Sequence, residues 1–229
     1  MDKRSVKFKA EVESYELHFH ARAHYVSADY YETLDRRLTY LKVACAAFGT
    51  AFGGKAIYEY IEWSEEQPDG RQGSSKAMML AIASFGAAAI TQLYTTGQAP
   101  SQKQKFHNEA AAQMKALRKK VQAWSDTIPE TETVEQKDRL RKQYEEYIDE
   151  HCKIDNLIKS EDWTFSEVHD TLPKGWKDKG RELGMYIPKR DIWYYFQKYK
   201  KIAEPYLQIT IGVMAVIGLW KYISEGDGK

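Results

Sequence analysis

The sequence predicts an all-α membrane protein, and three observations lead to this fold class. Apolar residues gather into three dense runs, although the mean hydropathy of the whole chain is low. Residues 6–38 contain neither glycine nor proline. Between residues 110 and 158, apolar side chains recur at alternating spacings of four and three, the period of a packed helix. We therefore expect a long N-terminal amphipathic helix, a transmembrane helical hairpin, a cytoplasmic antiparallel coiled-coil hairpin and a third, C-terminal transmembrane helix.

The composition limits the classes of function. The 34 basic and 33 acidic residues nearly cancel, so no overall field favours nucleic acid or an acidic substrate as a partner. The two cysteines, Cys45 and Cys152, make no disulfide framework and fit a reducing compartment. Charges occur throughout the first 38 residues, so no signal peptide is visible.

Residues 1–39 are predicted to form a cytoplasmic helix, and residues 40–96 a transmembrane hairpin. A spanning helix needs ~20 mostly apolar residues. The second apolar run begins at Ala77 and meets this requirement, because no charge follows it before Lys103. Lys42, Lys55 and Glu59 interrupt the first run. That run spans only if Lys55 snorkels or faces a polar interior, and its alternative is a buried helix of a soluble protein.

The third transmembrane helix is predicted over residues 205–223. No charge occurs before Lys221, and this lysine lies where it could snorkel. Aromatic side chains stand beside lysines just ahead of this run, and we interpret them as an interfacial belt: Trp193, Tyr194, Tyr195, Phe196 and Tyr199.

A cytoplasmic coiled-coil hairpin is predicted over residues 103–158. Its first seam consists of Ala110, Met114, Leu117, Val121 and Trp124, and its second of Leu140, Tyr144, Tyr147, His151, Ile154 and Ile158. Pro129 lies at the fold-back between them. An ordinary amphipathic pair packed on the N-terminal helix is the alternative. Residues 159–204 are expected to be irregular, with an amphipathic helix after Pro188.

Loop charges predict the orientation. Basic residues lie before the first run and after the second, while the loop between the two runs is acidic; these residues are Arg36, Arg37, Lys42, Lys103 and Lys105, and Glu62, Glu65, Glu66 and Asp69. By the positive-inside rule, both ends of the hairpin are cytoplasmic. We expect a multi-pass inner-membrane protein with a cytoplasmic N-terminus and an external C-terminus.

The segment "GTAFGGKA", residues 49–56, resembles a phosphate-binding loop, because Gly49, Gly54 and Lys55 fit its pattern. Ala56 stands where that loop needs a magnesium-binding hydroxyl, and the chain lacks the alternating strands and helices that such a site requires. We prefer a helix-packing role for the glycines, because Gly49 and Gly53 form G-x-x-x-G. Four small residues give the second run a matching surface: Ala83, Gly86, Ala87 and Ala89.

Polar residues inside the membrane runs have two interpretations. Lys55 and Glu59 are four residues apart, and Thr91 and Gln92 lie near the end of the second run. They line a pore, or else Lys55 and Glu59 lie at the outer headgroups. The pore interpretation gains in an oligomer, because two or three helices cannot enclose water by themselves.

Three histidines lie close together in "HFHARAH", and His20 and His24 share a helical face at a spacing that can bind zinc. No Glu follows His20 to complete H-E-x-x-H, and no cysteine is near, so a packed polar face is preferred. The remaining histidines, His107, His151 and His169, are isolated in the sequence. No catalytic set is recognisable, so we expect neither an enzyme nor a cofactor.

The segment "HARAHYVSADYYETLDRRLTYLKVACAAFGTAFGG" and the later "KFHNEAAAQMKALRKKVQAW" resemble SLATT domains over about residues 15–158. These are two-transmembrane effector domains associated with bacterial conflict systems. The resemblance implies an oligomer that forms pores or disrupts the inner membrane when a nucleotide second messenger or a similar sensor is triggered. Lys55, Glu59 and the region after residue 160 depart from the family pattern.

The leading hypothesis is therefore an oligomeric membrane effector in antiviral defence. Its expected partners are the lipid bilayer, further copies of the chain, and a sensor protein or nucleotide second messenger. The alternative is a non-conducting membrane anchor that recruits a partner through its coiled coil. A third hypothesis, a metal-dependent membrane enzyme, depends on His20 and His24.

Overall fold

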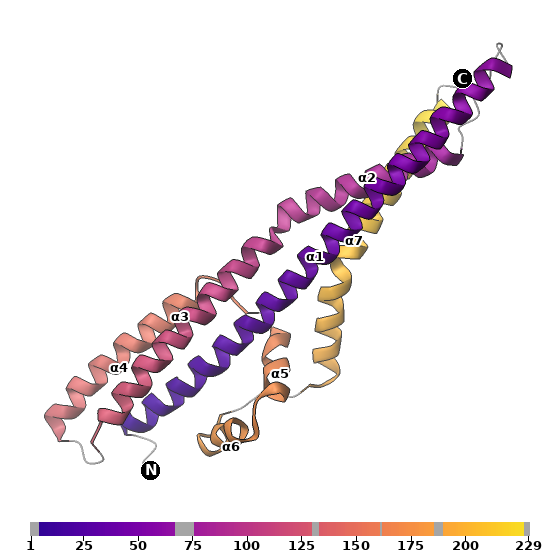
Figure 1. Ribbon diagram of the computed structural model, residues 1–229. Helices are drawn as coiled ribbons and strands as arrows, with labels where there is room; N and C mark the ends of the chain where they lie inside the picture. The colour runs from indigo at the N-terminus through magenta and orange to yellow at the C-terminus, as the bar shows by residue number, and fades with distance from the viewer. Residues whose placement is uncertain (1–4, 67–75, 130–132, 161, 186–189, 227–229) are drawn as a thin grey trace. The chain divides into compact units, whose positions relative to one another are not determined.

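The computed structural model describes residues 5–66, 76–129, 133–160, 162–185 and 190–226, and every element in these ranges is an α-helix (Figure 1). The order is α1 (Val6–Glu66), α2 (Lys76–Gln98), α3 (Pro100–Thr127), α4 (Val134–Asp155), α5 (Asp162–Thr171), α6 (Lys174–Glu182) and α7 (Ile192–Gly226). The predicted all-α fold class is confirmed. Of the acidic residues behind the predicted orientation, Glu62, Glu65 and Glu66 belong to the end of α1, and Asp69 lies outside the described residues.

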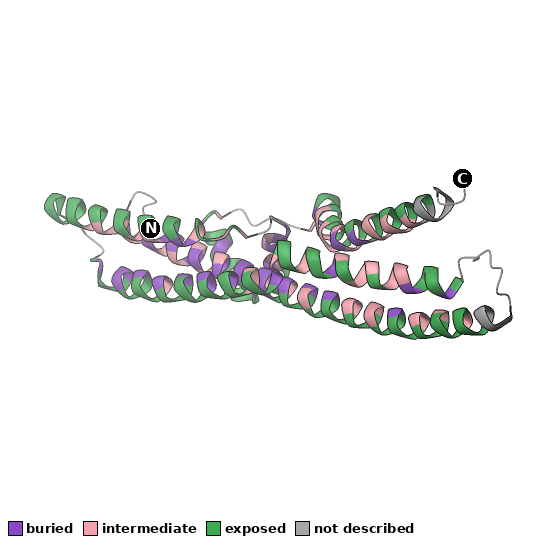
Figure 2. Ribbon diagram, turned by 90° about the horizontal axis from the view of Figure 1, so that it is seen from above, coloured by how far each residue is buried: buried purple, intermediate pink, exposed green. Residues whose placement is uncertain are grey.

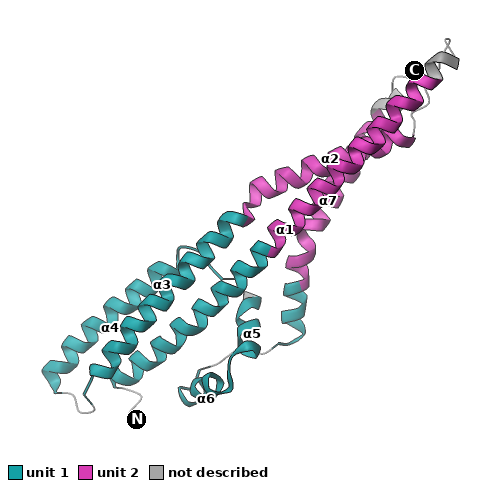
Figure 3. Ribbon diagram, viewed as in Figure 1, with its two compact units in different colours: residues 1–32, 101–198 teal, residues 33–100, 199–229 magenta. Residues whose placement is uncertain are grey.

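The chain divides into two compact units (Figure 3). Unit 1 comprises residues 1–32 and 101–198, and unit 2 comprises residues 33–100 and 199–229. Helix α1 contributes its first half to unit 1 and continues without a break into unit 2. Helix α7 starts in unit 1 and also continues into unit 2. Two helices are therefore shared by both units.

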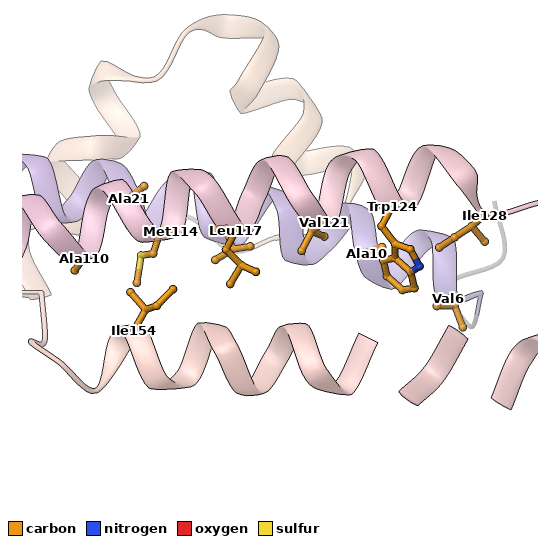
Figure 4. Packing of buried hydrophobic residues seen from close by; sticks show 11 residues of the cluster. Val6, Ala10, Ala21, Ala110, Met114, Leu117, Val121, Trp124, Ile128 and Ile154 are labelled. Atoms are coloured by element: carbon orange, nitrogen blue, oxygen red, sulfur yellow. The ribbon is translucent and has the colours of Figure 1, made fainter. Parts of the chain in front are cut away.

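The core of unit 1 is built by α1, α3 and α4 (Figure 4). The residues of the first predicted seam are all buried in it: Ala110, Met114, Leu117, Val121 and Trp124. Helix α1 adds Ala10, Leu17 and Ala21, and α4 adds Ile154. The seam thus packs against two helices, because the small alanines of α1 let its backbone approach. Burying each large apolar side chain here contributes roughly 1.5–3 kcal/mol.

Two short helices occupy the region expected to be irregular. Helix α5 packs Val168 and Leu172 against Phe19 and Ala23 of α1, and Trp176 of α6 lies against the same cluster. These helices have 10 and 9 residues, too few turns for a clear apolar period. Helices this short are marginal alone, so their stability comes from packing on α1.

Helix ends follow local chemistry. Thr133 forms a capping box with Gln136 at the start of α4. Helix α2 ends at Gln98, because Ala99 has a positive φ of 43°. Pro100 is then the first residue of α3. Asp191 begins α7 by accepting a 2.8 Å hydrogen bond at Oδ1 from the backbone N–H of Tyr194.

Two helical stretches in the described part of the chain are long and apolar enough to cross a membrane: Lys76–Thr127, which contains α2, and Ile192–Trp220 of α7. Only 17% and 11% of their apolar windows are buried, unlike the core helices of a soluble protein. The first apolar run, inside α1, is not among them. Most of the buried residues belong to unit 1. Figure 2 shows them in purple, concentrated along part of the helices.

Candidate functional site

Unit 2 brings two glycines of α1 against α2. A methyl group placed on Gly49 would lie 3.0 Å from the ring of Phe85. One placed on Gly53 would lie 3.9 Å from Phe85 and 4.0 Å from Ala81. Lys42 Nζ donates a 2.9 Å hydrogen bond to Gln92 Oε1. Gly49 therefore permits a closer approach to α2 than any larger residue would.

These contacts define how α1 and α2 run. From Lys42 to Gly49 to Gly53, the partners step back along α2 from Gln92 to Phe85 to Ala81 by equal intervals. An equal and opposite step is the register of an antiparallel pair. Continuing it places Lys55 across from the first turn of α2, and Glu59 across from the helix start.

Helix α7 packs on α2 in the same manner. A methyl group at Gly86 of α2 would lie 3.1 Å from Val216 Cγ1, and one at Gly212 of α7 would lie 3.0 Å from Ile90 Cδ1. Gly86 of α2 makes room for Val216 of α7, and Gly212 of α7 makes room for Ile90 of α2. The partner of Gly86 is therefore α7, a contact that the sequence did not predict. Ala83 and Ala87 are half-buried in α2.

The segment that resembles a phosphate-binding loop is helical in the structure. Residues 49–56 lie inside α1, between its first residue Val6 and its last residue Glu66. Backbone N–H groups inside a helix are already bonded to carbonyls one turn earlier, so they are not free to hold phosphate. Gly49 and Gly53 lie against α2 instead, whereas a methyl group placed on Gly54 would meet nothing within 4 Å.

The candidate pore residues fall into separate environments. Lys55 Nζ lies 3.7 Å from Glu59 Oε1, with side-chain exposures of 65% and 39%. Thr91 is fully buried, and its hydroxyl donates to the carbonyl of Ala87 at 2.7 Å. Gln92 is exposed and bonds to Lys42. The hydroxyl of Thr91 is therefore satisfied inside its own helix, whereas Lys55 and Glu59 pair with each other and Gln92 bonds to α1.

The opposite face of α1 consists of small exposed residues. Four of them recur at helical spacing: Ala44, Ala47, Ala51 and Gly54. Nothing lies within 4 Å of a methyl group placed on Gly54. We call these four residues the outer face of α1. It has the small-residue composition of a close helix–helix contact, and all four residues are exposed.

Large apolar side chains are exposed on all three helices of unit 2. They include Val43, Phe48 and Ile57 of α1, Met78, Leu80, Phe85 and Leu93 of α2, and Leu207, Ile211, Met214 and Leu219 of α7. Soluble monomers rarely expose so many large apolar residues together.

Unit 1 contains a second candidate site, a group of buried histidines. His24 and His107 are fully buried, and their Nδ1 atoms lie 2.9 Å apart. Nε2 of His24 has no hydrogen-bond partner in the described part of the chain. The pair joins α1 to α3, with His107 stacked on the ring of Tyr31.

A second histidine contact joins α1 to α4. His151 Nδ1 lies 2.6 Å from Glu13 Oε1, and both side chains are buried. Its Nε2 lies 3.2 Å from Nδ1 of His20. We call Glu13, His20, His24, His107 and His151 the histidine cluster. His107 and His151 are not isolated, because the fold brings them against residues far away in the sequence.

The cluster contains groups with opposite pKa shifts. Burial lowers the pKa of His20 to about 4, with His151 adding to the effect. Burial and the neighbouring His24 lower the pKa of His107 to about 4. For His151, burial lowers the pKa, but the hydrogen bond and charge of Glu13 outweigh it and raise the pKa overall. The pKa values of His20 and His107 therefore lie below the ordinary value of 6.5, and the pKa of His151 lies above it.

The predicted metal candidates bond to different helices. His20 contacts His151 on α4, and His24 contacts His107 on α3. Among the residues that the structure describes, no group of three or more His, Cys, Asp or Glu side chains is placed to hold a metal ion. His20 and His24 therefore contact histidines on two different helices.

An ion-pair network fixes the first turns of α7 on α5. Glu167 lies 2.9 Å from Arg190 and 2.8 Å from Lys198, and it also accepts a hydrogen bond from Tyr194. Tyr194 is buried, so it does not belong to the predicted interfacial belt. The other four aromatic residues of that belt are exposed.

No protein-family model, curated protein or solved structure matches the chain.

Proposed function

We propose that the protein is an oligomeric membrane effector whose unit 2 assembles a pore in the inner membrane. The single observation that carries this proposal is the surface of unit 2, where exposed large apolar side chains surround a helix with a small-residue face. The resemblance to SLATT domains, and with it a role in bacterial antiviral defence, is part of the proposal.

Membrane insertion is supported by length and by exposure. Helix α2 has 23 residues, which at 1.5 Å each gives about 34 Å, against about 30 Å for a hydrocarbon core. Helix α1 follows α2 in antiparallel register from Lys42 to Gly53. Two helices packed over the same depth share one solvent, so we propose that α1 also spans, as one arm of the hairpin.

The register between α1 and α2 relates the charged pair of α1 to the ends of the proposed span. Lys55 lies level with the first turn of α2, which is one end of the proposed span, and Glu59 lies one turn of α1 further on. Lys42 and Gln92 lie toward the other end. Polar groups at both ends and small apolar residues between them suit a pore with a narrow, dewetting constriction.

Assembly is proposed to use the outer face of α1. Gly49, Gly86 and Gly212 already pack inside the chain, whereas Gly54 meets nothing. Small residues at helical spacing let a second backbone approach in lipid. Copies of α1 gathered about one axis would place Lys55 and Glu59 at the outer mouth.

The test uses Gly54→Leu, with Gly218→Leu as the matched control. Both glycines are exposed in apolar helices with nothing within 4 Å, but Gly218 lies on α7. Particle mass in detergent gives the oligomer, and potassium efflux from phosphatidylethanolamine–phosphatidylglycerol liposomes gives conduction. Gly54→Leu should reduce both, and Gly218→Leu should leave both intact. Unchanged assembly and efflux in Gly54→Leu would refute the outer face as the interface.

One observation favours the alternative, a non-conducting anchor. The polar residues lie toward the ends of the proposed span, and Thr91 is buried with its hydroxyl bonded to its own helix. An anchor needs no polar path through the bilayer. Oligomers that never release potassium, under acid or neutral conditions, would support the anchor and end the pore proposal.

A further inference from the structure

The histidine cluster of unit 1 has no part in the proposed pore, and its geometry points to a separate device. We propose that it is a proton-operated latch: acidification around unit 1 breaks the histidine contacts that hold α3 and α4 against α1. This inference concerns unit 1 alone and does not depend on the proposed function of unit 2.

The contact between His24 and His107 permits only one proton between its two nitrogens. At 2.9 Å, one Nδ1 must donate its N–H and the other must accept it. A second proton would place two N–H groups against each other in a fully buried site. Protonation of His24 also leaves Nε2–H without an acceptor in the described residues. Both consequences push α1 and α3 apart.

The contact between His20 and His151 is limited in the same way. The Glu13 carboxylate accepts from Nδ1 of His151, which leaves Nε2 of His151 to share one proton with Nδ1 of His20. When His151 is charged, Nε2–H donates to a neutral His20. A proton on His20 Nδ1 removes that acceptor. The bond between α1 and α4 is then replaced by repulsion between two imidazolium rings.

Charged and titratable groups from each packed helix surround the cluster. Helix α1 supplies Glu13 and Glu16, α3 supplies Lys103, and α4 supplies Asp155 and Tyr144. Asp155 favours charge on His20 and His24, while Lys103 opposes charge on His107. From α5, the neighbour of His20 is the uncharged ring of Phe165. The carboxylates thus gather around His151, where one positive charge is already accommodated.

The direction of the pH dependence follows from these shifts. His20 and His107 have a pKa of about 4 when packed, below the ordinary value of 6.5. Their contribution is complete above about pH 6.5 and is lost as the pH falls toward 4. His151 has a raised pKa, so its contribution is present below 6.5 and is lost as the pH rises through the raised value. The latch is therefore tightest near pH 6.5.

Hydrogen exchange of the full chain in nanodiscs tests the latch. Exchange at pH 6.5 and 5.0 is corrected for the intrinsic rate and followed in peptides of α3 and α4. Each histidine whose pKa rises from about 4 to 6.5 on opening shifts the opening equilibrium about thirty-fold at pH 5. We expect faster exchange at pH 5.0 in both helices. Equal protection at the two pH values would overturn the proposal.

The double variant His24→Asn, His107→Asn assigns the effect. Asparagine keeps polar atoms near the Nδ1 positions but does not titrate, so the acid response of α3 should fall by at least ten-fold. His169→Asn is the control, because His169 bonds to the adjacent Asp170 outside the cluster. A folded double variant with the full acid response would show that these histidines are not the sensor.

A measurement on the native chain covers the case in which the double variant does not fold. Nuclear magnetic resonance titration of the histidine Cε1–H signals reports each ring directly. We expect His20 and His107 to titrate below pH 6 together with exchange broadening from opening. Independent titration of both near pH 6.5, without broadening, would overturn the latch.

Discussion

The two units of this protein use one helix, α1, in opposite ways. In unit 1, α1 is enclosed, and its alanines, histidines and Glu13 contact α3 and α4. In unit 2, the same helix carries glycines against α2 and leaves small and apolar residues exposed. The first arrangement buries polar side chains among protein, and the second leaves large apolar side chains exposed. One continuous helix therefore serves as a core element along its first part and carries an exposed apolar surface along its second.

The largest expected effect is in the buried polar core. Glu13→Gln removes the carboxylate from His151 and leaves a buried imidazolium without its partner, a change worth about 3–5 kcal/mol. Glu150→Gln is the control, because its ion pair with Lys120 is exposed and should contribute no more than about 1 kcal/mol. Equilibrium guanidinium unfolding of the full chain, followed by circular dichroism, measures both. Equal losses in the two variants would contradict the buried site.

The second prediction compares one leucine from each unit. Leu117→Ala opens a cavity in the unit 1 core and should cost about 2–5 kcal/mol. Leu207→Ala changes an exposed side chain of α7, so unfolding in micelles should shift by less than about 1 kcal/mol. A large loss for Leu207→Ala would mean that this face is enclosed by protein.

Much of the unit 1 core could be predicted from sequence, whereas its histidine contacts could not. The spacing of Met114, Leu117 and Val121 gives a helical face directly, because helical period is a local property. The partner of His24 is His107, which lies on another helix far along the chain. Only the fold brings them together, so no local pattern distinguishes them from surface histidines.

In unit 2, the sequence predicted small residues for packing but not their partners. Gly49 and Gly86 both lie in contacts, but one faces α2 and the other faces α7. The rotation of each helix decides this choice, and rotation depends on all three helices together. Nor did the sequence show which part of α2 lies across from Lys55, which follows only from the register of the two helices.

The third prediction compares two glycines of α1. Gly49→Leu forces a side chain into the ring of Phe85 and should destabilise the α1–α2 contact by about 1–3 kcal/mol. Gly54→Leu meets open space, so it should leave the monomer stable. Thermal unfolding in detergent at a concentration that keeps the chain monomeric separates them. Equal destabilisation would mean that the two faces of α1 are not distinct.

The smallest effect is expected at the start of α7. Glu167→Gln weakens the ion pairs with Arg190 and Lys198, which are partly exposed and therefore screened, so the loss is about 1 kcal/mol. Hydrogen exchange should rise in the first turns of α7 and not in α3. A change spread over all of unit 1 would show that Glu167 supports more than the α5–α7 contact.

The two native cysteines give the most direct test that the units lie in different solvents. Cys45 belongs to α1 in unit 2, and Cys152 is exposed on α4 in unit 1. Sealed inside-out membrane vesicles are treated with a membrane-impermeant maleimide, and labelling after denaturation in detergent is the reference. We expect rapid labelling of Cys152 and no labelling of Cys45 until denaturation. Labelling of Cys45 in intact vesicles at the rate of Cys152 would contradict it.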